Sequence, residues 1–231
     1  MSRALAVGRL HLVGWPRAVS WPWTILALSF TVNLVLFRAI GPEPGHLIIT
    51  GGLSALYILM LVVHIQAITR LFPFAAALSV TRSAFYTGTC LVAVGQAVAY
   101  GAVLTGLLAI ERGTDGWGGS MRFFGLPYLV AGDPVTQLAI YAGPLLAMSA
   151  IGLVCGSIYQ RWQSTGMFLA FVGSVIGLGA IGWWITWIGS WPAVGRWLVD
   201  QPAVAVLGGW STLLAVLIAA GGFLVIRRTP T

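Results

Sequence analysis

The chain has 231 residues, of which 58% are hydrophobic and only 7% are charged. A soluble domain of this size does not need so much apolar side chain, whereas helices that face lipid do, so the composition predicts an all-α integral membrane protein. All twelve basic residues are arginine, and the lack of lysine excludes a standard P-loop ATPase and a Schiff-base enzyme, because both use one.

Six apolar runs are long enough to cross a bilayer as helices, since about 20 residues span the hydrocarbon core. They occupy residues 21–39, 47–69, 84–110, 135–159, 166–188 and 203–226. We therefore expect a six-span membrane domain over 21–226, a cytoplasmic interfacial segment over 1–20 and a cytoplasmic tail over 227–231. In the fifth run, Gly173 and Gly177 have the four-residue spacing that permits close approach of two helices.

Charge separates between the two sides that six spans define. One side carries eight arginines and no acid: Arg3, Arg9, Arg17, Arg70, Arg82, Arg161, Arg227 and Arg228. The other carries four arginines and five acids: Arg38, Arg112, Arg122, Arg196, Glu43, Glu111, Asp115, Asp133 and Asp200. Because basic loops remain in the cytoplasm, we expect a multi-pass protein of the cell inner (plasma) membrane with both termini cytoplasmic. The net charge of +7 is then a topology signal, and no nucleic-acid partner is expected.

Two segments on the other side are more than simple turns. Residues 111–134 are rich in glycine, with turn signals at Asp115-Gly116 and Gly118-Gly119. Residues 191–202 are too polar to span and too aromatic to be free in water, which favours an interfacial or re-entrant helix before the sixth span.

The runs contain few groups suited to catalysis. His64 is the only histidine within a run, there is no HExxH motif, and every acid falls outside the runs, so we expect no catalytic, metal or cofactor site in this chain. Polar residues in lipid often mark a pathway, and the candidates to line one are Asn33, His64, Gln96 and Trp184. The alternatives are hydrogen bonds between helices for the first three and an interfacial aromatic belt for Trp184.

The segment between the second and third runs, 66–89, is unusually long and basic for a connection. It carries Arg70 and Arg82 but no acid, and Pro73 is well placed in the first turn of a short helix. Such a helix would align Phe74, Leu78 and Phe85, with Ala77, in one apolar stripe. The alternative is a plain turn with flanking topology charges.

This segment resembles the inner loop of six-span permease subunits of two-component ABC exporters, as found in actinobacteria. The resemblance is carried by Phe72-Pro73-Phe74-Ala75, Val80-Thr81-Arg82, Phe85 and Gly88-Thr89. The chain departs from the pattern at Ala76 and at Ser83, where a second arginine is common.

The resemblance implies that the 70–86 segment is a coupling helix that docks on a separate ABC ATPase dimer. The residues that it assigns to this contact are Arg70, Phe72, Pro73, Phe74, Leu78, Thr81, Arg82 and Phe85. It further implies export by a dimer of permeases, formed with a second copy or a paralogue, with ATP and magnesium bound in the partner ATPase. Two alternatives remain open: a non-transporting membrane scaffold or assembly factor, and a membrane enzyme or redox subunit that uses His64.

Overall fold

The computed structural model describes residues 15–40 and 48–228. Most of the expected interfacial segment 1–20, the first residue of the second apolar run and the last residues of the expected tail lie outside these ranges. The described residues are mostly helical, and only one pair of two-residue strands occurs among them. In chain order the elements are α2 (Trp15–Ile40), β1 (Ile48–Ile49), α3 (Ser54–Gln66), η1 (Ala67–Leu71), α4 (Phe72–Ala77), α5 (Arg82–Gly113), η2 (Gly116–Ser120), β2 (Met121–Arg122), η3 (Pro127–Leu129), α6 (Pro134–Trp187), α7 (Trp191–Asp200), η4 (Val204–Trp210) and α8 (Ser211–Ile226).

Five of the described helical segments are long and apolar enough to cross a membrane, as their composition predicts. They are Ser20–Ala39, Ser54–Ala77, Arg82–Gly113, Pro134–Trp187 and Val204–Ile226. The second begins later than expected, because residues 48–49 pair in parallel with 121–122 instead of joining the helix. Gly52 allows the chain to pass from β1 into α3 close to Phe123, since a Cβ at this position would clash with the Phe123 ring.

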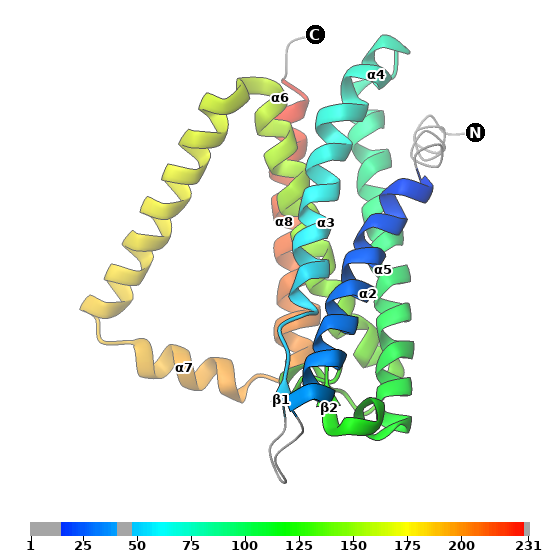
Figure 1. The fold of residues 1–231 in the computed structure, drawn as a ribbon. Coiled ribbons are helices and arrows are strands. Elements are labelled where there is room, and N and C mark those ends of the chain that lie inside the picture. Colours follow the sequence, from blue (N-terminus) through cyan, green and yellow to red (C-terminus); the bar gives the residue numbers. More distant parts are fainter. Residues whose placement is uncertain (1–14, 41–47, 229–231) are drawn as a thin grey trace.

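The longest helix, α6, has two arms. Its 54 residues would extend about 80 Å if straight, far more than a bilayer core of about 30 Å. Gln163 interrupts it with non-helical backbone angles, φ 54° and ψ −148°, and the chain reverses direction there (Figure 1). We call residues 134–162 the ascending arm and 164–187 the descending arm; they correspond to the fourth and fifth apolar runs.

The ascending arm lies inside the bundle and packs against α3, α5 and α8. Its glycines permit this: a Cβ on Gly152 would meet the Leu61 carbonyl oxygen, and one on Gly156 would lie 2.7 Å from the Ile68 Cβ. The close approach of two helices therefore occurs at Gly152 and Gly156 of the ascending arm, and not at Gly173 and Gly177 of the descending arm. Around the latter two, no described atom other than the adjacent residues and backbone of the same helix lies within 4 Å of where a Cβ would be.

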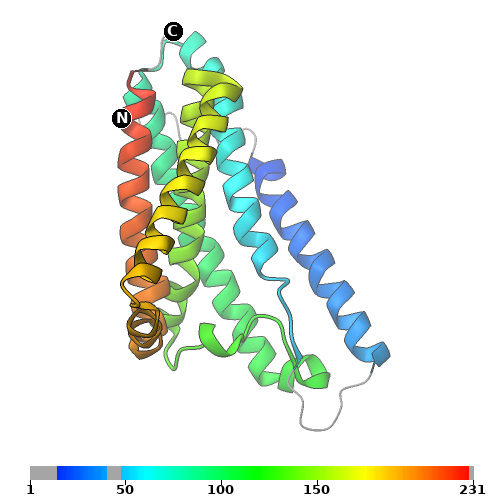
Figure 2. The ribbon, with the colours of Figure 1, turned by 90° about the vertical axis from the view of Figure 1, so that its left-hand side faces the viewer.

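The descending arm leaves the bundle, and α7 runs crosswise from its foot back towards α8 (Figure 1). Figure 2, viewed from the side of this arm, shows the arm in front of the bundle and α7 end-on. Large apolar side chains remain exposed along the arm, among them Phe168, Phe171 and Leu178. α7 contains no buried residue, although Trp197 contacts Trp210 edge-on at 6.0 Å. The segment expected to form an interfacial or re-entrant helix before the last span is thus helical.

The two ends of the bundle differ in charge. At one end α3 continues into α4, α5 begins, α6 reverses and α8 ends (Figure 1). The arginines described there include Arg70, Arg82, Arg161, Arg227 and Arg228, with no acid among the described residues. We call this the basic end. The opposite end holds all the acids that the structure describes, so the segregation expected from the sequence holds for the described part of the chain.

One acid corrects the sequence analysis, which placed every carboxylate outside the membrane-spanning runs. Glu111 lies in the last turn of α5 and is fully buried. Its carboxylate accepts hydrogen bonds from the backbone N–H groups of Phe123, Phe124 and Gly125, at 2.7–3.0 Å, and from the Trp117 indole at 3.1 Å. A buried charge is tolerated only with such compensation. Glu111 therefore anchors the 114–125 loop to the end of α5.

Candidate functional site

The basic end owes its shape to Pro73, which occupies the first turn of α4 as predicted. Proline has no N–H, so the carbonyl four residues earlier, that of Thr69, lacks its helical donor. The Gln160 side-chain amide, from the ascending arm, donates to this carbonyl at 2.9 Å. The π-helix η1 covers the same stretch, as is frequent where a helix ladder is disturbed. The helical path from α3 therefore continues through Pro73 into α4. The carbonyl that Pro73 leaves without a donor is also the group to which α6 is hydrogen-bonded.

The connection from α4 to α5 is a tight reversal of four residues, 78–81. Val80 N–H donates to Ala75 O at 3.1 Å and Ser79 N–H to Ala76 O at 3.0 Å, which is the Schellman pattern. Ser79 takes the left-handed conformation, φ 58°, that usually belongs to glycine there. Thr81 then caps α5, accepting the Ala84 N–H at 3.4 Å. The long basic segment of the sequence is thus almost entirely helical, with a short turn at its tip.

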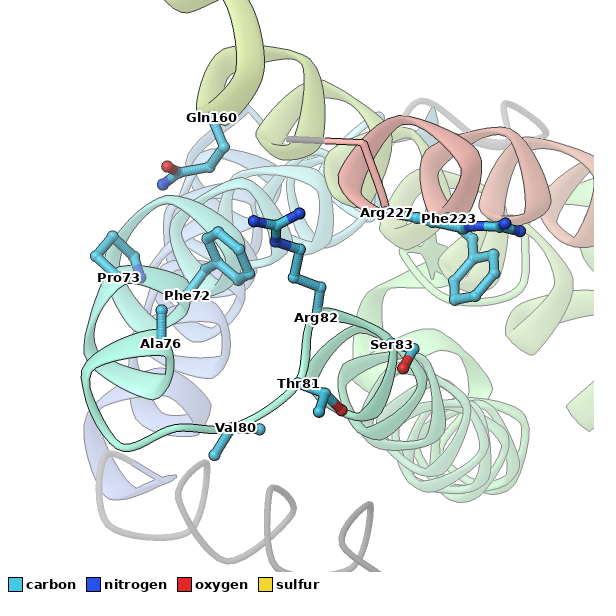
Figure 3. Close-up of a pocket in the computed structure, with 10 residues that line it drawn as sticks. All are labelled: Phe72, Pro73, Ala76, Val80, Thr81, Arg82, Ser83, Gln160, Phe223 and Arg227. Carbon is cyan, nitrogen blue, oxygen red and sulfur yellow. The ribbon is translucent and has the colours of Figure 1, made fainter. Parts of the chain in front are cut away.

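Behind this turn lies a cavity of about 690 Å³, which we call the arginine cavity. It is bounded by the α4–α5 turn, α6 and α8 (Figure 3). Its lining residues are Phe72, Pro73, Ala76, Val80, Thr81, Arg82, Ser83, Gln160, Phe223 and Arg227. Figure 3 shows the Arg82 guanidinium directed between the Phe72 ring and the end of α8, while Arg227 extends over Phe223.

The cavity is electropositive. Two arginines line it and no acid does, and no described acid lies at this end of the bundle. The N-terminus of the 32-residue α5 opens beside it and adds the partial positive charge of a helix dipole. The Arg227 backbone N–H donates to Phe223 O, but within the described residues the guanidinium groups of Arg82 and Arg227 form no hydrogen bond or ion pair. The arrangement therefore favours an anionic group.

A smaller cavity of about 370 Å³ lies on the other side of η1. It is lined by Ile65, Thr69, Arg70, Cys155, Tyr159 and Met167, so residues of both α6 arms contribute to it. Arg70 is its only charged member. The two arginines that the sequence singled out, Arg70 and Arg82, thus line different cavities.

The predicted coupling residues fall into two sets rather than one stripe. Phe72 and Phe85 are buried and their rings pack at 5.5 Å, which ties α4 to α5. Phe74 and Leu78 are 56% and 54% exposed at the tip of the basic end. The stripe fails because Ser79 reverses the chain, so that α4 and α5 do not continue one helical face. Of the remaining members, Pro73, Thr81 and Arg82 line the arginine cavity.

The four candidate pathway residues are not brought together. Asn33 donates to Ser29 O within α2 at 2.7 Å, and Gln96 donates to the Tyr100 hydroxyl within α5 at 3.0 Å. His64 is buried, with Nδ1 at 2.8 Å from Met60 O, whereas Trp184 is exposed on the descending arm. None of the four lines either cavity. For the first three, each of these contacts lies within a single helix, whereas the alternative given above was hydrogen bonds between helices.

Sequence reasoning missed three cavity residues: Gln160, Phe223 and Arg227. The charge pattern placed Arg227 on the correct side, but no local signal indicated that it would face the α4–α5 turn. Gln160 was detectable only by asking which side chain would satisfy the carbonyl freed by Pro73. Comparisons with protein-family models, with curated proteins and with solved structures found no match to this chain.

Proposed function

We propose that this chain is the membrane-spanning permease subunit of an ABC exporter, driven by a separate ATPase. The observation that carries the proposal is the pair Phe74 and Leu78, two large apolar side chains exposed at the tip of the basic end. Large apolar side chains that are exposed at such a tip are suited to a protein surface, because they gain nothing from contact with water.

The proposed topology has six spans, counting each arm of α6 as one. Positive loops are retained in the cytoplasm, so the basic end is assigned to the cytoplasmic face of the plasma membrane, with both termini there. The α4 tip then projects towards the compartment that supplies ATP. In this proposal ATP and magnesium bind to the partner, and the chain itself catalyses no reaction.

The contacts of α4 support its role as a coupling helix. It continues α3 through η1, and Phe72 packs on Phe85 of α5. A partner that moves Phe74 and Leu78 would therefore move α3 and α5 with them. Such a displacement of packed helices is an ordinary way to bias a transporter between two states.

The descending arm supports the second part of the proposal, a permease pair made with a second copy or a paralogue. Phe168, Phe171 and Leu178 are exposed along it, and within the described chain nothing but the adjacent residues and the helix's own backbone lies within 4 Å of a Cβ built on Gly173 or Gly177. Glycines at this spacing allow another helix to approach closely. The pathway is proposed to lie between the two permeases, which fits the scattered positions of the polar candidates.

The test is co-purification of the tagged chain from its own cells in mild detergent. We expect an ABC ATPase to accompany the wild-type chain and to be lost with Phe74→Asp and Leu78→Asp. Tyr128→Asp is the matched control, since Tyr128 is 66% exposed in η3, at the opposite end of the bundle. Recovery of the chain with no ATPase would overturn the proposal and favour the membrane scaffold or assembly factor.

A further inference from the structure

We propose that the arginine cavity binds the phosphate headgroup of an anionic phospholipid, held by Arg82 of α5 and Arg227 at the end of α8. This inference concerns a site on the chain alone and does not depend on the exporter assignment.

The first argument is the chemistry of the lining. The polar members are two guanidinium groups, two hydroxyls and an amide, on Arg82, Arg227, Thr81, Ser83 and Gln160. Guanidinium groups bind phosphate through paired N–H donors and remain charged at any physiological pH. With no acid in the lining and none described at this end, the cavity carries uncompensated positive charge. The ligand that it favours is therefore an anion.

The second argument selects a lipid over a soluble anion. Half of the lining is apolar, namely Phe72, Pro73, Ala76, Val80 and Phe223. A site for free phosphate gains nothing from these side chains, whereas the upper part of a lipid is both charged and apolar. The volume of about 690 Å³ lies within the range of about 300–1,000 Å³ typical of small-molecule sites.

The third argument is the level of the cavity along the helices. The apolar stretch of α8 ends at Ile226, and Arg227 follows immediately. At the same end Arg161 stacks on the Trp162 ring at 4.3 Å, and tryptophan is enriched where hydrocarbon meets headgroups. Within α8, on the membrane side of Arg227, Leu217 and Leu224 are exposed and offer an apolar surface to acyl chains. A basic pocket between helices at this level is where anionic headgroups bind.

A bound headgroup would have a structural consequence. Arg82 belongs to α5 and Arg227 to the end of α8, while Gln160 of α6 completes the wall between them. A phosphate that contacts both arginines would link α5 to α8. We therefore expect an anionic lipid to raise the thermal stability of the chain as well as to bind it.

The experiment titrates the delipidated, detergent-purified chain with short-chain phosphatidylglycerol and follows both binding and the melting temperature. Phosphatidylcholine with the same acyl chains is the lipid control, and inorganic phosphate and glycerol 3-phosphate are the soluble controls. We expect saturable binding and stabilisation by phosphatidylglycerol only. Equal binding of both lipids would overturn the proposal, and equal binding of a soluble phosphate would overturn the assignment to lipid.

Variants locate the site. Each arginine near anionic lipid contributes about 1 kcal/mol, or about fivefold in affinity, so Arg82→Gln with Arg227→Gln should weaken binding about 25-fold. The matched control is Arg70→Gln with Arg228→Gln, which removes the same charge from the same end but outside the cavity. An equal loss in both pairs would show a diffuse surface effect and contradict a defined site. Arg227→Gln alone changes one exposed residue after α8 and still tests the site if the double variant misfolds.

This test is separable from that of the proposed function. It needs no ATPase, and Phe74→Asp lies outside the cavity lining, so that variant should retain lipid affinity while losing the ATPase. Loss of lipid affinity in Phe74→Asp would contradict the location assigned here.

Discussion

The two arms of α6 are consecutive in sequence and both apolar, yet they meet different surroundings. The ascending arm is interior, with Ile140, Tyr141 and Leu145 almost fully buried. The descending arm contains one buried residue, Gly166, which lies in its first turn next to Trp162. Hydropathy alone assigns both arms to a membrane. The arms differ in their glycines: Gly152 and Gly156 of the ascending arm lie against α3 and η1, whereas Gly173 and Gly177 face no other element. Hydropathy therefore predicts insertion of a helix into the membrane but not its packing against other helices.

The ascending arm is further fixed at its start by the loop that Glu111 organises. The Tyr141 hydroxyl donates to Phe124 O at 2.9 Å, and the Phe124 N–H in turn donates to Glu111 at 2.9 Å. The descending arm has no comparable connection among the described residues. This contrast gives the largest expected effect.

Glu111→Ala should destabilise the chain by about 3 kcal/mol or more, because four N–H donors lose their acceptor, three of them backbone groups in a buried loop. Hydrogen exchange should become faster at residues 123–125 and at the start of the ascending arm, and stay unchanged in the descending arm. Uniform acceleration in both arms would show that they unfold as one unit and would break the comparison. Asp115→Asn, at an exposed acid of the same loop, is the control, because asparagine tolerates the left-handed φ of 48° there.

Gly156→Leu should cost about 1–3 kcal/mol, since the added side chain must displace Ile68 from its contact with α6. Gly177→Leu, on the descending arm, should leave the melting temperature of the solitary chain unchanged. Thermal unfolding of both variants in detergent measures the difference. If Gly177→Leu is equally damaging, the descending arm has a close neighbour in solution, which would support the proposed second copy.

Gln163→Gly should stabilise the chain by about 1 kcal/mol, because φ 54° with ψ −148° is a region that only glycine occupies readily. Gln163→Ala should give no gain, since alanine has the same backbone restriction. Equal gains from both would assign the effect to the glutamine side chain instead. The measurement is again thermal unfolding, and the change concerns the turn that separates the arms.

The smallest effect is expected at Asp133, which caps the ascending arm. Hydrogen bonds from the Thr136 side chain and backbone N–H lower the pKa of this exposed carboxyl below its ordinary value of 3.8. Its contribution is therefore present above pH 3.8 and lost as the pH falls through the lowered pKa. Asp133→Ala should reduce the melting temperature slightly at neutral pH, with no difference from wild type in strong acid. A difference that persists in acid would assign the effect to something other than the cap charge.

The sequence predicted the helices well, because continuous apolar runs and arginine placement are properties of single segments. It predicted Pro73 in a first turn for the same local reason. It left residues 160–165 unassigned between the fourth and fifth runs, whereas the chain turns at Gln163 with helix on both sides. It also expected Phe74 and Phe85 on one face, and the left-handed Ser79 prevents this.

The arginine cavity was beyond sequence reasoning because its walls come from three distant segments. Arg82 and Arg227 are separated by most of the chain, and only the packing of α8 beside α5 and α6 brings them to one space. The same holds for Glu111, whose burial depends on a loop folding back over the end of α5. Pairings across helices are set by shape, and a hydropathy pattern carries no information about shape.

The hydrogen bond from Gln160 to the Thr69 carbonyl mechanically couples η1, which leads directly into α4, to the turn of α6. Gln160 stands three residues before the reversal at Gln163, and it holds a carbonyl that is available only because Pro73 has no proton to donate. A partner that displaces α4 would therefore either break this hydrogen bond or move the start of the descending arm as well. The missing proline N–H thus links the segment that leads into α4 to the turn from which the descending arm leaves the bundle.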